Sequence, residues 1–455
     1  MTTMVVAFIV VIGPLILIHE LGHFLVARLC GVGVERFSIG FGPVLLRWRG
    51  RETEYCLSAI PMGGYVKMMG EENPLEGGGG VDDDPSKAFA GKRLWARFLI
   101  VFAGPGMNFV LAWAIFAVML ATVGRPVWPA ALGRVEGDGP GAVAGLRTGD
   151  TVLAVDGAPI RHWEDFERAV AGSGGRALAL RVRGDGGERS LTVTPRRKTF
   201  TEPVFRETRE AWDIGVTPHF VPEVSSIGPN SPAERAGLRA GDVVTAVDGQ
   251  PIHTRDDVVD AIRARPGQTF PLTVERGGAR LTLTVTPEPV QDKSPDGREL
   301  TIGKIQAGFT VRAVSWEAYG PIEAIGHGIV RTWDLSVLIL KGLGKLVSGS
   351  LDRSNIGGPI QIAIEAGRQA KEGPSALALL VAMISVNLAI LNLLPVPMLD
   401  GGHLLFFVIE AALGRPLSIK KREAAQQIGF ALLMLLMVYA FYNDLVRLDA
   451  FRIFR

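Results

Sequence analysis

The sequence has little of what marks several common classes of protein. Cys30 and Cys56 are its only cysteines, and neither belongs to a CxxC pair, which excludes a disulfide framework and a cysteine metal site. The net charge is only +2, and no basic run is interleaved with aromatic residues, so we expect no nucleic-acid partner. The chain is instead apolar, with 47% hydrophobic residues and a mean hydropathy of +0.25. Membrane spans are therefore expected.

Four long apolar runs account for this composition. They cover residues 4–29, 98–123, 376–394 and 427–446. Each is close to the roughly 20 residues that a helix needs to cross about 30 Å of hydrocarbon. The sequence therefore predicts a multi-pass α-helical membrane protein with about four transmembrane helices.

Basic residues indicate how these helices are oriented. Many lie in residues 28–97, between the first two runs, and four more lie in residues 415–422. Because cytoplasmic loops are rich in Lys and Arg, both segments are predicted to be cytoplasmic, with the termini and the middle region outside. The basic residues after position 446 favour the opposite orientation more weakly.

The middle region, about residues 125–320, contains an internal repeat. "AGLRTGDTVLAVDGAPI" at 144–160 aligns without gaps with "AGLRAGDVVTAVDGQPI" at 236–252. Each copy reads as a Gly-rich turn, a short strand, an Asp-Gly turn, a helix and two further strands. The two copies resemble tandem PDZ domains, which are α+β modules whose exposed strand edge suits a peptide C-terminus. Plain spacer domains are the alternative.

The motif "HELGH" at residues 19–23 places polar side chains inside the first apolar run. On an α-helix His19, Glu20 and His23 share one face. Histidines at i and i+4 can bind one metal ion, and the intervening glutamate can take a proton from a water molecule. Since each ionisable side chain in a membrane costs on the order of 2–3 kcal/mol, a chance match is disfavoured. The motif predicts the site of a zinc peptidase.

A catalytic zinc ion usually has three protein ligands, so one more is needed. Asp400 is the best candidate, because it lies between Pro397 and Gly401, where the third helix must be interrupted. The first and third runs cross the membrane in the same direction, which brings Asp400 and the two histidines to one depth. His403 is the rival ligand, although we favour a polar residue near the membrane face for it.

The combination of motifs resembles the site-2 protease family of intramembrane metalloproteases, most closely its bacterial members with tandem PDZ domains. It comprises "HELGH", "GFG" at 40–42, "PMGGYVKM" at 61–68, the two repeats and "NLLPVPMLDG" at 392–401. The resemblance implies that His19, His23 and Asp400 bind one Zn²⁺ ion and that Glu20 is the catalytic base. It also implies a bacterial inner-membrane location. The expected substrate is a membrane-spanning protein such as an anti-sigma factor, trimmed outside beforehand and then cut within the bilayer.

The resemblance implies further roles as well. Asn392 is expected to hydrogen-bond the substrate backbone or the developing oxyanion, or else to link two helices. Gly63, Gly64, Tyr65 and Val66 are expected to form a strand of a membrane-associated β-hairpin that pairs with an unwound substrate, or that only fills space in the bundle. Residues 320–347 have an amphipathic pattern interrupted by glycines and are expected to lie along the outer membrane surface.

These expectations divide the chain into five parts. The predicted parts are an N-terminal membrane part (1–124), two PDZ domains (125–219 and 220–310), an amphipathic segment (311–375) and a C-terminal membrane part (376–455). The predicted function is that of a zinc-dependent intramembrane endopeptidase. A non-catalytic, membrane-anchored PDZ receptor or scaffold is the alternative.

Overall fold

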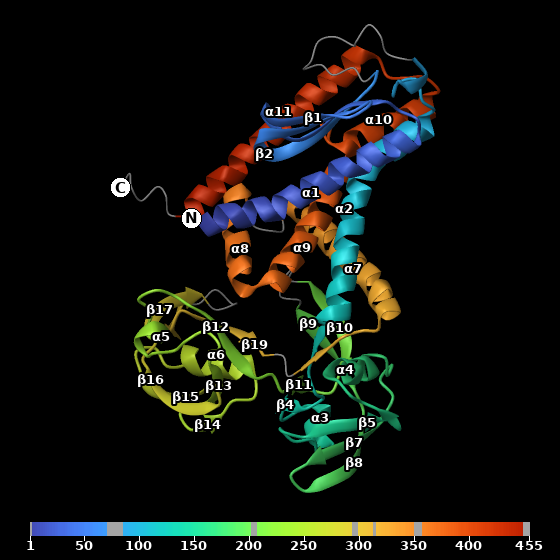
Figure 1. The fold of residues 1–455 in the computed structure, drawn as a ribbon. Coiled ribbons are helices and arrows are strands. Elements are labelled where there is room, and N and C mark those ends of the chain that lie inside the picture. The colour runs from blue at the N-terminus through green and yellow to red at the C-terminus, as the bar shows by residue number, and fades with distance from the viewer. Residues whose placement is uncertain are drawn as a thin grey trace. The chain divides into compact units, whose positions relative to one another are not determined.

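The computed structural model describes residues 2–70, 85–201, 207–293, 299–312, 315–349 and 357–448 (Figure 1). The chain forms two compact units. Unit 1 comprises residues 1–124 and 318–455, and unit 2 comprises residues 125–317. Each unit is described by itself.

Among the described residues of unit 1, four helices are long and apolar enough to cross a membrane: α1 (Thr2–Leu29), α2 (Leu94–Thr122), α9 (Pro374–Leu393) and α11 (Ile419–Arg447). They correspond to the four predicted spans. The helices α2 and α11 begin earlier than the apolar runs, because each continues N-terminally past charged residues: Arg97 in α2, and Lys420, Lys421 and Arg422 in α11.

The structure describes four further helices in unit 1, and all but the shortest pack against these four. They are α7 (Pro321–Val347), α8 (Pro359–Glu372), α10 (Asp400–Leu413) and the short 3-10 helix η1 (Pro85–Lys87). The predicted amphipathic segment is thus one continuous helix, α7, and its glycines do not interrupt it. Gly328 has a packing role instead. A Cβ atom at this position would lie 3.1 Å from the backbone nitrogen of Ala117 in α2, so the glycine permits close packing of the two helices.

A small sheet lies beside α1. Its strands are β1 (Val34–Arg49) and β2 (Glu54–Met68), and β1 pairs with both halves of β2. Phe37 lies opposite Val66 on one side and Tyr55 on the other. The segment predicted as a strand, residues 63–66, forms the edge half of β2.

The first module of unit 2 is built around one sheet with the strand order β6-β5-β7-β8. Its elements are β3 (Arg125–Val127), β4 (Leu132–Val135), α3 (Pro140–Val143), β5 (Thr151–Val155), β6 (Ala158–Pro159), α4 (Trp163–Ala171), β7 (Leu178–Gly184), β8 (Gly187–Val193), β9 (Arg196–Thr201), β10 (Thr208–Asp213) and β11 (Val216–Pro218). Phe166 on α4 is 1% exposed and lies in the same hydrophobic core as Leu132 of β4 and Leu180 of β7.

The second module repeats this plan with the strand order β16-β15-β13-β12-β19 and β14 beside β13. Its elements are β12 (Pro222–Ile227), α5 (Pro232–Arg235), β13 (Val243–Val247), β14 (Gln250–Pro251), α6 (Arg255–Arg263), β15 (Phe270–Arg276), β16 (Ala279–Val285), β17 (Glu288–Lys293), β18 (Glu299–Lys304) and β19 (Ala307–Val311). Strand β20 (Ser315–Glu317) returns to pair with β3. Val311 in β19 and the residues of β20 thus belong to unit 2 and not to the amphipathic segment predicted for residues 311–375.

The repeated aspartates have matching structural roles in the two modules. Asp156 and Asp248 have positive φ angles of 49° and 53°, which fits the Asp-Gly turns predicted for both copies. Asp242 is fully buried and accepts hydrogen bonds from Arg276 at 2.6 and 2.7 Å and from the Arg239 backbone N–H at 2.8 Å. Asp150 accepts the equivalent backbone hydrogen bond in the first module.

Candidate metal centre

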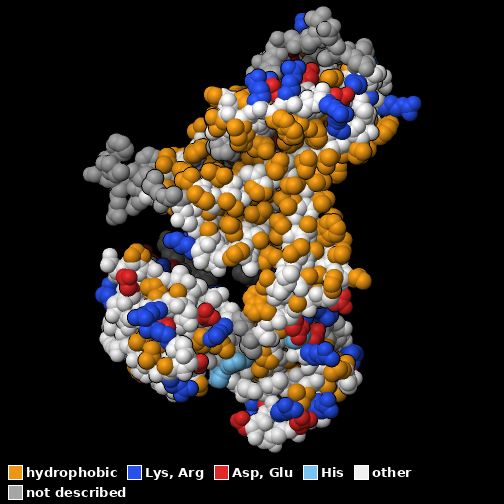
Figure 2. Space-filling view, viewed as in Figure 1, with side chains coloured by type: hydrophobic (Ala, Val, Ile, Leu, Met, Phe, Trp, Pro, Cys, Tyr) orange, Lys and Arg blue, Asp and Glu red, His pale blue; other side chains and the backbone are white. Residues whose placement is uncertain are grey.

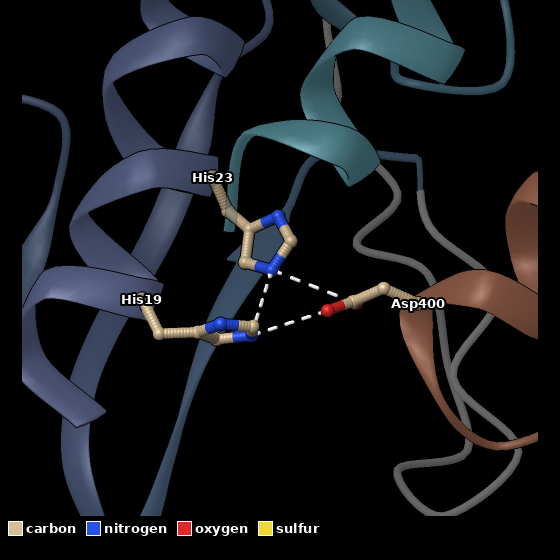
Figure 3. A group of neighbouring side chains, drawn as sticks. All are labelled: His19, His23 and Asp400. Atoms are coloured by element: carbon tan, nitrogen blue, oxygen red, sulfur yellow. Dashed lines mark hydrogen bonds and ion pairs between the residues drawn. The ribbon is translucent and has the colours of Figure 1, made fainter. Parts of the chain in front are cut away.

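The two histidines of the HELGH motif lie one turn apart on α1 and face the same side (Figure 3). His19, Glu20 and His23 are each no more than 9% exposed. Glycines let α2 approach this face closely. A Cβ atom on Gly22 would overlap the Ala103 carbonyl oxygen, and one on Gly104 would overlap the His23 ring. The imidazoles therefore fill a space that only glycine leaves open.

Asp400 reaches the histidines from the opposite side of the site. Helix α9 ends at Leu393, and α10 begins at Asp400 itself. The predicted interruption is therefore correct, but it is a short loop that leads directly into a further helix. Cβ atoms on Gly401 or Gly402 would overlap backbone carbonyls of this loop, so both glycines are needed to fold the loop back on α10.

The three predicted ligands converge on one point (Figure 3). Asp400 Oδ2 lies 3.2 Å from His19 Nε2, and Asp400 Oδ1 lies 3.6 Å from His23 Nε2. The two Nε2 atoms are 3.3 Å apart. Zn–N and Zn–O bonds of about 2.0–2.2 Å in a tetrahedron require ligand atoms about 3.3–3.6 Å apart. The donor atoms thus have the type and spacing of three ligands of one zinc ion.

Hydrogen bonds orient both imidazoles. His23 Nδ1 lies 2.9 Å from the Ile100 carbonyl oxygen, which can only accept, so Nδ1 carries the proton and Nε2 is left to bind a metal. His19 Nδ1 lies 3.3 Å from the side-chain amide of Asn108, a fully buried residue of α2. Asn108 Oδ1 has no hydrogen-bond partner among the described residues. An amide turned by 180° would place Oδ1 where it accepts the proton of His19 Nδ1.

Sequence reasoning missed Asn108 and Gly104. The available signal for Asn108 was a polar residue in the middle of an apolar run, which usually has a partner or a function. Gly104 gave no such signal, because glycine is common in membrane helices. His403, the rival ligand, lies in α10 and is not in the group of converging side chains found among the described residues.

The predicted substrate-binding strand lies next to the predicted base. A Cβ atom on Gly64 would lie 2.8 Å from Glu20 Cγ, so the backbone of β2 passes directly beside the Glu20 side chain. Gly63 has a φ of 110° and packs on Phe41. The Tyr65 hydroxyl accepts a hydrogen bond from Arg36 at 3.2 Å.

The last two predicted contact residues have different surroundings. Val66 packs against the small core between α1 and the sheet. Asn392 lies in the last turn of α9 and is half-buried. Its role as a contact for the substrate stays a prediction.

Two histidines and a carboxylate on apolar helices, with a buried glutamate beside them, define a membrane-embedded metallopeptidase. Comparisons with known proteins agree. The sequence matches the model of peptidase family M50 over residues 7–436. The chain therefore belongs to peptidase family M50, which confirms the predicted site-2 protease family and metalloendopeptidase activity.

Full-length relatives support this assignment. A protein of Ralstonia nicotianae that is described as a zinc metalloprotease is 40% identical over 98% of both chains. The Regulator of sigma-E protease RseP of Escherichia coli is 37% identical over 97% of this chain and 98% of its own. A regulator of sigma E protease from Salmonella typhi is 38% identical with the same coverage. The match thus includes the membrane helices and the middle region.

Proposed function

We propose that His19, His23 and Asp400 bind one zinc ion and that Glu20 is the catalytic base. When bound, zinc lowers the pKa of a water molecule to about 7 and polarises the scissile carbonyl. The Glu20 carboxylate accepts the proton of the attacking water and returns it to the leaving amine. The convergence of the three ligand atoms within tetrahedral spacing is the observation that carries this proposal.

The position of β2 supports a way to present the substrate. A helix keeps its carbonyl groups hydrogen-bonded, so a transmembrane substrate must unwind before a peptide bond is exposed. Strand addition to the edge half of β2 would hold the unwound segment extended beside Glu20. Gly64 is suited to this edge because it has no side chain between the backbone and Glu20.

The proposed substrate is a single-pass membrane protein of the anti-sigma-factor type, cut after trimming outside the membrane. Relatives named as regulators of sigma-E protease support this class. We place the enzyme in a bacterial inner membrane, with the termini and unit 2 outside and the metal centre toward the cytoplasm. The two modules of unit 2 would act as PDZ domains, which either bind peptide C-termini or exclude bulky outer domains.

The test of the base is the substitution Glu20→Gln in the full-length enzyme. It keeps the shape of the side chain but removes the proton acceptor, so cleavage of a model transmembrane substrate should stop while zinc stays bound. Glu365→Gln, the same change on α8, is the matched control and should cleave normally. Wild-type cleavage by Glu20→Gln would refute the assigned base.

A further inference from the structure

Charged residues line up across one end of the β1–β2 sheet. Arg36 lies opposite Lys67 on one side and opposite Glu54 on the other, and Glu54 lies opposite Arg49. The turn that follows, residues 50–53, closes this end of the sheet. A polar cavity of about 360 Å³ lies here, lined by these residues and by the turn.

The next rows of the sheet change from aromatic to aliphatic. Tyr55 lies opposite Trp48, with ring centroids 5.5 Å apart, and Trp48 is 71% exposed. Two residues further along, Leu57 lies opposite Leu46, which is 66% exposed. Apart from Arg47 in the intervening row, which forms an ion pair with Glu54, the rows change from charged to aromatic to aliphatic, as side chains do across a membrane interface. The exposed apolar residues are therefore those expected to face lipid.

Contacts with α1 give this order a direction. Glu52 in the turn forms an ion pair with Arg28 in the last turn of α1. Gly64 of β2 lies beside Glu20. Glu20 is more than two helical turns before Arg28 in α1, and so lies deeper in the membrane. The charged end of the sheet is thus level with the end of a membrane-spanning helix, whereas the aliphatic rows are closer to the level of the metal centre. Lys and Arg side chains also gather at one end of unit 1, beyond the hydrophobic band (Figure 2).

The cavity is lined by more cationic than anionic side chains. Every glutamate that lines it already has a cationic partner, and these pairs include Glu35–Lys67, Glu52–Lys87 and Glu54–Arg36. Arg49 and Arg51 are exposed, and neither forms an ion pair within the part of the chain that the structure describes. Two guanidinium groups at the level of the headgroups are therefore available to an anion.

We infer that Arg49 and Arg51 bind the phosphate headgroup of an anionic phospholipid in the leaflet at this end of α1. Guanidinium groups bind phosphate oxygens in pairs of parallel hydrogen bonds. In an anionic headgroup the negative charge of the phosphate is uncompensated, whereas a zwitterionic headgroup of the same size carries a cation that guanidinium groups repel. The bound lipid would hold the sheet at a fixed depth beside Glu20. Lipid binding by these arginines does not depend on the membrane orientation proposed above. That orientation determines only which leaflet this is, namely the cytoplasmic one.

The experiment measures lipid binding by native mass spectrometry of the purified full-length protein. Phosphatidylglycerol and phosphatidylcholine with identical acyl chains are titrated separately, and the apparent affinity for the first bound lipid is compared. An arginine near an anionic surface contributes roughly fivefold in affinity. The double variant Arg49→Gln/Arg51→Gln should therefore lose about thirty-fold in phosphatidylglycerol affinity, with phosphatidylcholine unaffected.

Three controls make the result specific. Arg49→Lys/Arg51→Lys keeps the charge but loses the paired hydrogen bonds, so it should bind more tightly than the glutamine variant and less tightly than the wild type. Arg161→Gln/Arg181→Gln removes two exposed arginines of unit 2 and should change nothing. Zinc content, measured for each variant, should stay at the wild-type level and shows that the metal centre is intact.

Several results would overturn the inference. Wild-type phosphatidylglycerol affinity in Arg49→Gln/Arg51→Gln, or an equal loss in the unit 2 control, would show that these arginines do not bind the lipid. Displacement of the lipid by an equal concentration of glycerol phosphate would show a site for soluble phosphates instead.

Discussion

Gly104→Ala tests how tightly α2 packs against the metal ligands. The added Cβ atom would overlap His23 Nε2 and would lie 2.9 Å from His19 Cε1, where ordinary contacts begin at about 3.4 Å. Either the imidazoles shift or α2 moves away from α1. An extra methyl group in a close-packed site costs roughly 1–3 kcal/mol.

The size of the expected loss in zinc affinity depends on which atoms move to relieve the overlap with the added methyl group. The ligand nitrogens are the closest atoms, so the loss should appear in zinc binding. Because 1.4 kcal/mol is a factor of ten, the zinc dissociation constant should rise about five- to 150-fold. Competition with a chromophoric chelator, in detergent at fixed pH, measures this constant directly, and cleavage at limiting zinc should fall in parallel.

Gly13→Ala is the matched control for this substitution. Gly13 lies on α1 with no atom within 4 Å of an added Cβ, so the same chemical change should leave zinc affinity unchanged. Wild-type zinc affinity in Gly104→Ala would refute the close packing described for the metal centre. An equal loss in both variants would show a general effect of alanine on the helices.

Two further predictions concern Asn108 and Asp242. Asn108→Ala removes the partner of His19 Nδ1 and should weaken zinc binding about 10- to 100-fold in the same titration; an unchanged constant would contradict its role. Burial alone would raise the pKa of Asp242, but hydrogen bonds from Arg276 and the Arg239 backbone lower it below its usual value. Its contribution to stability is therefore complete above the unfolded pKa of about 3.9 and lost as pH falls through the lower folded pKa. Asp242→Asn should lower the free energy of unfolding of the second module by about 2 kcal/mol at pH 7 and by less near pH 3. Denaturant unfolding at the two pH values measures this difference. An equal effect at both pH values would contradict the prediction.

Much of the fold could be predicted from the sequence because its strongest signals are local. Apolar runs marked the four candidate membrane-spanning helices found in the described part of the chain, since length and hydrophobicity alone define a span. The repeated Asp-Gly turns marked both modules of unit 2, because few other sequences adopt the backbone angles that Asp156 and Asp248 show. The HELGH spacing placed His19 and His23 on one helical face for a purely geometric reason.

Contacts between distant segments could not be predicted in the same way. Pro397 and Gly401 suggested a helix interruption, but Gly401 and Gly402 also allow the loop before Asp400 to fold against the start of α10. The glycines of α7 suggested interruptions, yet Gly328 serves helix packing. Neither role is visible without the neighbouring backbone. The pairing of β1 with both halves of β2 is likewise set by tertiary structure.

Zinc content of the purified full-length protein tests the shared metal site most directly. Wild type and His403→Ala should each contain one zinc ion per chain, because His403 lies outside the ligand group, whereas Asp400→Ala should lose the metal. Full zinc occupancy in Asp400→Ala, together with its loss in His403→Ala, would contradict the proposed site.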